Sequence, residues 1–161
     1  MRPIRLKTSA LEAVTGYSRF KLRGLLAEVF PDSARGKKTG AHRTFSRQDL
    51  LVVAVACEIE EKYGVERKKL AQAAEALRRE LTGPRGANRD ARLLIRFAPS
   101  TVTYLESGSP VAEGLVIQLG PLFEKVDEYL GASSASGAQA QAVLPLRPTI
   151  ATGRRGGSRN R

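Results

Sequence analysis

Basic and hydroxyl-bearing side chains are concentrated in one short segment near the N-terminus, which contains Tyr17, Ser18, Arg19, Lys21 and Arg23. Because Arg19 and Arg23 are four residues apart, they would share one face of a helix. A guanidinium donates two parallel hydrogen bonds to a phosphate or to the edge of a guanine, whereas a lysine is a point charge that suits a phosphate. These residue types favour recognition of a polyanion.

The positive charge of the chain is concentrated at its two ends. Residues 1–48 hold eleven basic and three acidic side chains, a charge of +8, and residues 147–161 hold five arginines and no acid. Residues 49–146 carry a charge of −2. Charge that serves only solubility need not cluster, whereas a localised basic surface binds nucleic acid by releasing counterions from its phosphates. We therefore favour a polyanionic partner over a purely solubilising role.

The basic segment is predicted to lie in two short helices separated by a turn. The spacing Ser9-x-x-Glu12 predicts a capping box and a helix through about Val14. Ser18 is predicted to cap a second helix, Ser18–Val29, whose apolar positions are Phe20, Leu22, Leu25, Leu26 and Val29. This arrangement predicts a helix-turn-helix, whose second helix lies in the major groove of DNA and reads base edges through Arg19 and Arg23. Tyr17, Ser18 and Lys21 are expected to contact the phosphate backbone.

The next segment is polar, basic and rich in glycine. Residues 35–43 are predicted to form a wing that contacts phosphates through four basic side chains: Arg35, Lys37, Lys38 and Arg43. Ser46 and Asp49 then predict the start of a helix that continues to Tyr63, with apolar residues on more than one face, so this helix should be central to the core. A further helix is predicted over residues 66–81.

The pattern changes beyond a segment rich in glycine and proline. Alternating apolar residues predict two strands around a Pro99-Ser100 turn, and residues 114–119 predict a third strand. Gly120-Pro121 predicts the start of a helix. Three strands are too few to be stable alone, so we expect them to pack on the helices or on a second chain.

The fold class expected from these elements is α+β and mainly helical. Its parts are a winged helix-turn-helix domain over residues 1–82, a linker over 83–91, a small β-rich segment with a C-terminal helix over 92–131, and a disordered, Arg/Gly-rich tail over 132–161.

Residues 8–81 resemble the MerR family of bacterial winged helix-turn-helix regulators. The matching residues are Leu11-x-x-x-Thr15-Gly16-x-Ser18, Leu22-Arg23, Arg43-Thr44-Phe45-Ser46-x-x-Asp49-Leu50, and Tyr63-Gly64-Val65 followed by Leu70. The resemblance implies DNA binding. It does not extend to effector response or to the family's usual dimer. Gly24-Leu25 replaces the family's tyrosine pair, segment 92–130 replaces its long dimerisation helix, and there is no cysteine cluster for metal sensing.

The function expected is that of a sequence-specific regulator of transcription that binds double-stranded DNA as a homodimer on a palindromic site. One alternative is a DNA-architectural factor in recombination, partition or phage packaging. Another is an antitoxin-like module that holds a protein partner through residues 92–161. Tight binding to a palindrome favours the regulator, and strong bending of tandem sites favours the architectural factor.

An enzyme is not expected, because His42 and Cys57 are the only histidine and cysteine and there is no phosphate-cradling glycine loop. Neither a cofactor nor a metal site is expected, and Cys57 is interpreted as a core residue. The chain lacks an apolar run that could span a membrane and lacks a secretory signal at its start, so we expect a cytoplasmic, nucleoid-associated protein.

Overall fold

The computed structural model describes residues 5–31, 44–83 and 88–141, which contain five helices and one sheet of three strands. The helices are α1 (Thr8–Thr15), α2 (Arg19–Val29), α4 (Arg47–Tyr63), α5 (Arg67–Thr82) and α6 (Gly120–Gln141). The strands are β1 (Arg92–Phe97), β2 (Ser100–Leu105) and β3 (Leu115–Gln118). The mainly helical α+β class predicted from the sequence is confirmed.

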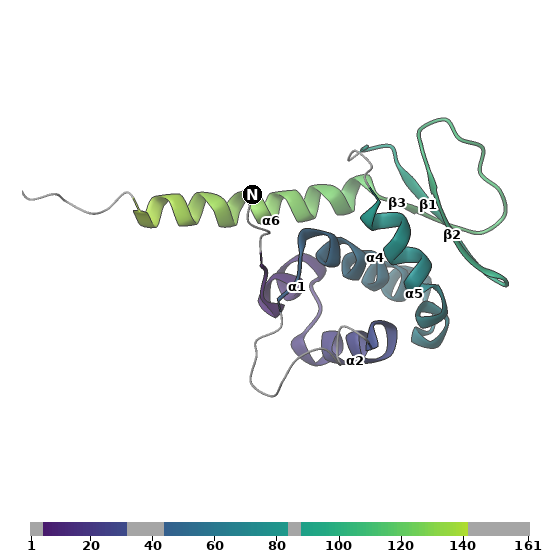
Figure 1. The fold of residues 1–161 in the computed structure, drawn as a ribbon, viewed down its shortest axis with the longest axis horizontal. Coiled ribbons are helices and arrows are strands. Elements are labelled where there is room, and N and C mark those ends of the chain that lie inside the picture. The colour runs from purple at the N-terminus through teal and green to yellow at the C-terminus, as the bar shows by residue number, and fades with distance from the viewer. Residues whose placement is uncertain (1–4, 32–43, 84–87, 142–161) are drawn as a thin grey trace, which may run out of the picture.

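Helix α4 is the centre of the fold because it is buried on all sides over most of its length. Every residue from Leu50 to Cys57 is buried, and so is Ile59. A helix that leaves no face in water must be covered by other elements. Helices α1, α5 and α6 all pack against α4 (Figure 1). The predicted central helix is therefore confirmed.

A reciprocal capping box begins α4. Ser46 Oγ accepts a hydrogen bond from the Asp49 N–H at 3.1 Å, and the Asp49 carboxylate accepts one from the Ser46 N–H at 2.9 Å. The capping box predicted at Ser9 is wrong, because α1 begins at Thr8 with Lys7 at the N-cap. The chain just before α1 is held instead by two backbone hydrogen bonds between Leu6 and Phe45, both of 2.8 Å.

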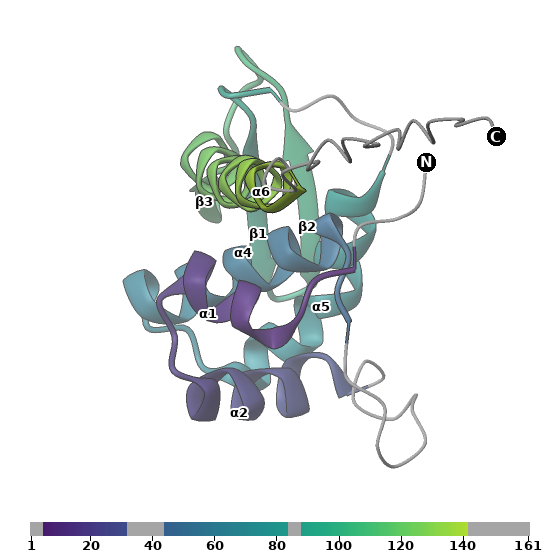
Figure 2. The same ribbon diagram turned by 90° about the vertical axis from the view of Figure 1, so that its left-hand side faces the viewer.

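The sheet has the strand order β2-β1-β3, and both pairs are antiparallel. Leu93 on β1 is paired with Tyr104 on β2 and with Ile117 on β3. Leu93, Ile95 and Ile117 are at most 1% exposed and belong to the same buried cluster as the helices. The sheet packs on α5 (Figures 1 and 2), so the expectation that the strands pack on the helices is confirmed.

The segment predicted as a linker ends inside this common core. Ala91 is fully buried, and its carbonyl accepts a hydrogen bond from the Leu119 N–H at 2.9 Å, directly before α6. The helical part and the β-rich part therefore share one continuous apolar interior rather than two separate ones.

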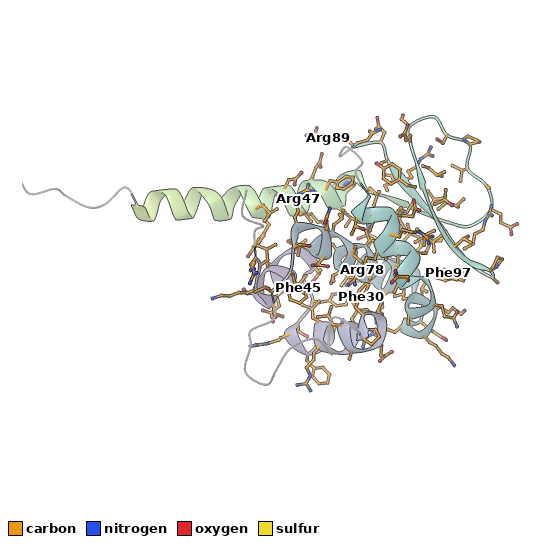
Figure 3. The ribbon with its side chains drawn as sticks, in the orientation of Figure 1. Phe30, Phe45, Arg47, Arg78, Arg89 and Phe97 are labelled. Carbon is orange, nitrogen blue, oxygen red and sulfur yellow. The ribbon has the colours of Figure 1, made fainter. Side chains whose placement is uncertain are left out.

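Helix α6 begins at Gly120-Pro121 as predicted and packs on α1 and α4. Arg47 at the start of α4 forms a 2.6 Å ion pair with Asp127 of α6 (Figure 3). The helix continues to Gln141 and extends past the other helices (Figure 1), so it runs into the segment predicted as a tail from residue 132. The segment is rich in alanine, the best helix former, and a helix that has already started adds further residues at low cost.

The rest of the predicted tail, residues 142–161, lies outside the described residues. Within the part of the chain that the structure describes, no helix is both long enough and apolar enough to cross a bilayer.

Replacing Ser46 with alanine should lower the free energy of unfolding by about 1 kcal/mol, the usual cost of removing an N-cap side chain. The variant loses the acceptor for the Asp49 N–H. Urea denaturation followed by circular dichroism measures the change. Ser46→Thr keeps the hydroxyl and should stay within about 0.5 kcal/mol of the parent protein. An alanine variant as stable as the parent would contradict a stabilising role for the capping box.

Candidate nucleic-acid interface

The turn between α1 and α2 fixes the direction in which α2 leaves α1. Gly16 adopts the left-handed conformation, with φ of 72°, and donates its N–H to the Glu12 carbonyl at 2.9 Å. Thr15 Oγ1 accepts a hydrogen bond from the Tyr17 N–H at 3.2 Å. Ser18 Oγ then accepts one from the Lys21 N–H at 3.4 Å, which confirms Ser18 as the cap of α2. Glycine tolerates this conformation without strain, so the tight turn depends on it.

Tyr17 faces the core rather than solvent. It is 5% exposed, and its hydroxyl lies 3.3 Å from the Cys57 carbonyl and 3.3 Å from Glu60 Oε2, both on α4. The predicted contact of Tyr17 with DNA is therefore wrong, because the hydroxyl already has acceptors inside the protein. Burial, and after it the neighbouring Cys57 and Glu60, raise the pKa of Tyr17. The side chain stays neutral and anchors the turn on α4.

Arg67, the first residue of α5, connects three helices. Its Nε donates to Glu60 Oε1 on α4 at 2.7 Å, and its Nη1 lies 4.0 Å from Glu28 Oε1 on α2. The guanidinium also lies over Gly24 of α2, where an added Cβ would be 2.6 Å from Nη1. Gly24, which departs from the MerR pattern, thus leaves room for Arg67. Glu60 lies between Tyr17 and Arg67, so one polar chain ties the turn and α2 to α4 and α5.

A second arginine of α5 lies against the C-terminal end of α2. The Arg78 guanidinium carbon lies 5.5 Å from the centroid of the Phe30 ring, directly after α2, and its Nη2 is 4.0 Å from Asp49 Oδ1 (Figure 3). A cation over an aromatic face is attracted by the ring. Helix α2 is therefore attached to α5 along its C-terminal half, through Arg67 at Gly24 and Glu28 and through Arg78 at Phe30.

Four of the predicted DNA-binding residues at the start of α2 are open to solvent. Ser18, Arg19, Lys21 and Arg23 are all exposed. Lys21 Nζ lies 5.0 Å from the centroid of the Tyr17 ring, which holds it near the start of the helix. Neither Arg19 nor Arg23 forms an ion pair with another residue that the structure describes. Helix α2 lies at the edge of the molecule remote from the sheet and α6 (Figures 1 and 2).

Phe20 belongs to the outer face of α2, apart from the four other apolar positions predicted for the helix. Its exposed fraction is 80%, whereas Leu22, Leu25, Leu26 and Val29 are buried. At roughly 100° per residue, Phe20 lies about 180° around the helix from Val29, so helical geometry alone places it opposite the apolar stripe. The exposed position of the Phe20 ring can therefore be predicted from the spacing of the buried apolar residues along α2.

The predicted wing residues lie outside the residues that the structure describes, as does His42. They are Arg35, Lys37, Lys38 and Arg43. Where the structure does describe the chain, no group of three or more His, Cys, Asp or Glu side chains could hold a metal ion. Cys57 is 3% exposed, which confirms it as a core residue, and burial followed by Glu60 raises the pKa of its thiol to about 12.

Comparison with known proteins assigns no family to this chain, since no family model, curated protein or solved structure matches it. The resemblance to MerR regulators therefore depends only on the residues quoted above and stays a prediction.

Arg67→Ala should destabilise the protein by about 1.5–3 kcal/mol, because it removes a charge-assisted hydrogen bond from the partly buried Glu60. Urea denaturation measures the loss. Arg79→Ala is the matched control on the same helix, where the side chain is 72% exposed, and should change stability by less than about 0.5 kcal/mol. Equal effects of the two substitutions would contradict a linking role for Arg67.

Cys57 should resist alkylation by iodoacetamide in the native protein. With a thiol pKa of about 12, roughly a thousandth of the native molecules carry a thiolate at pH 9, against roughly half of the unfolded chains. The same reagent in denaturing urea provides the unfolded rate. Because the raised pKa favours the protonated thiol in the native state, stability should fall as pH rises from about 9 toward 12. Native alkylation at the unfolded rate would contradict this assignment.

Proposed function

We propose that this protein is a sequence-specific DNA-binding regulator of transcription of MerR-like type, and that α2 is its recognition helix. In this proposal α1, the turn and α2 form a helix-turn-helix. The major groove of DNA is wide enough to admit one helix, and helix-turn-helix proteins place the first residues of the second helix against base edges. Arg19 and Arg23 would read guanine, and Ser18 and Lys21 would contact phosphates.

The observation that carries the proposal is the contrast between the two faces of α2. One face is buried on the core and fixed by Arg67 and Arg78, while the surface turned to solvent exposes Arg19 and Arg23, which lie one helical turn apart. A rigidly held element positions side chains more accurately than a loop does. The location of α2 at the edge of the molecule would let it enter a groove without collision from the sheet or from α6 (Figure 2).

The charge of the N-terminal third supports the same proposal. Residues 1–48 carry +8 of the total of +11. The basic residues of the proposed wing, Arg35, Lys37, Lys38 and Arg43, would add contacts to the phosphate backbone and fix the register of the protein on the duplex. Such contacts give affinity without sequence preference, so the specificity would come from α2.

A palindromic site would be bound by a homodimer, because two copies double the number of base contacts available to one small module. Segment 92–131 would supply the interface between the copies. Strand β2 is at the edge of the sheet, and an edge strand carries backbone groups that can pair with a second strand. A protein with this role would work in the cytoplasm, on the nucleoid.

The test is selection of bound duplexes from a random DNA pool at near-physiological salt, followed by titration of the selected site and of scrambled DNA. We expect a palindromic site bound about 1,000-fold more tightly than scrambled DNA. If no consensus sequence emerges and affinity depends only on salt concentration, a role as a sequence-specific regulator is excluded. An architectural or partner-binding role would then replace it.

Arg23→Ala should weaken binding to the selected site by about 5-fold to 150-fold, the range expected for losing a bidentate contact with a guanine, and should relax the preference for that base. Arg89→Ala removes the same charge from an 83% exposed side chain remote from α2 (Figure 3), and should change affinity less than about twofold. Equal losses would mean that Arg23 contributes only charge, which would contradict base reading.

A further inference from the structure

Phe20 is the most exposed large apolar side chain among the described residues. It is 80% exposed, whereas Tyr63 and Val111, the other exposed large apolar residues, are 48% and 47% exposed. It lies in the first turn of α2, which begins at Arg19. A ring in this position adds little to the stability of the free protein, because it buries almost no surface against it.

The surroundings of Phe20 are cationic. Arg19 and Lys21 are its neighbours in the chain, and Arg23 follows three residues later on the same face. An interface with another folded protein is built on an apolar centre from which charged residues are depleted. A single ring among cations fits instead a partner that carries isolated apolar groups between phosphates.

We infer that Phe20 reads the 5-methyl group of a thymine in the major groove, which rests on the function proposed above. A phenylalanine ring neither donates nor accepts a hydrogen bond, and the thymine methyl is the apolar group that the bases present in that groove. Phe20 is thereby a specificity-determining residue for an A·T pair, beside the arginines that read guanine.

The spacing along α2 places this thymine close to a guanine. Phe20 and Arg23 are separated by about 4.5 Å along the helix axis, against roughly 3.4 Å for each base pair of DNA. The thymine read by Phe20 and the guanine read by Arg23 therefore lie within one or two base pairs of each other in each half-site.

The test uses the full chain and the duplex selected from the random pool. Each thymine of the half-site is replaced in turn by deoxyuridine, which keeps every hydrogen-bonding group of the base and removes only the methyl. The parent protein should lose about fourfold in affinity at one position, the factor expected for one buried methyl group. Phe20→Ala should bind the thymine and uracil duplexes equally, and Phe20→Leu should keep part of the difference.

Two controls separate this contact from a general defect. Val111→Ala shortens another exposed apolar side chain, in the loop between β2 and β3, and should keep the full fourfold difference. Phe20→Ala should unfold at the same temperature as the parent protein, since the ring is exposed. Equal sensitivity of the parent and Phe20→Ala to uracil at every position overturns the inference while leaving the proposed function intact.

Two further results also count against the inference. If Phe20→Ala turns a dimer into a monomer without DNA, Phe20 is a contact between copies. If the random pool yields no preferred duplex, the proposed function fails together with the thymine contact.

Discussion

The burial of α4 is the constraint on which the rest of the structure depends. The consecutive buried residues from Leu50 to Cys57 leave no side of this stretch that can face water. Their apolar surface is removed from water only if other elements surround the helix, which α1, α5 and α6 do. The sheet then packs on α5 and extends the same interior through Leu93 and Ile117. Covering this one helix sets the positions of α1, α5 and α6, and the sheet and α2 pack in turn on α5.

Helix α2 is the element that this arrangement places at the outside. Its inner face is apolar, and its position is fixed by Arg67 and Arg78 of α5, which are held in turn by acidic residues of α4. Glu60 lies between the Tyr17 hydroxyl and the Arg67 guanidinium, which in turn covers Gly24. The outer face is left with Arg19, Phe20 and Arg23 exposed on a helix that is firmly held. That combination of rigidity and exposed charge is the basis for proposing a recognition helix.

Local rules were enough to predict most of the fold from the sequence. The caps at Ser18 and Ser46, the central helix and the three strands follow from spacing of a few residues. The site could be predicted less well, because Tyr17 meets its acceptors forty residues further along the chain, and no local pattern reveals that pairing. Phe20 was grouped with the apolar positions of its helix by residue type, although helical geometry places it opposite the apolar stripe.

The most direct measurement is a titration of the ¹⁵N-labelled protein with its selected duplex, followed by amide chemical shifts. If α2 lies in the major groove, the largest changes fall on residues 18–24, and the amides of the sheet and of α6 shift little. Large changes confined to the sheet or to α6, with α2 unaffected, would contradict the account. The DNA would then be bound elsewhere, and the exposed arginines of α2 would have to serve another partner.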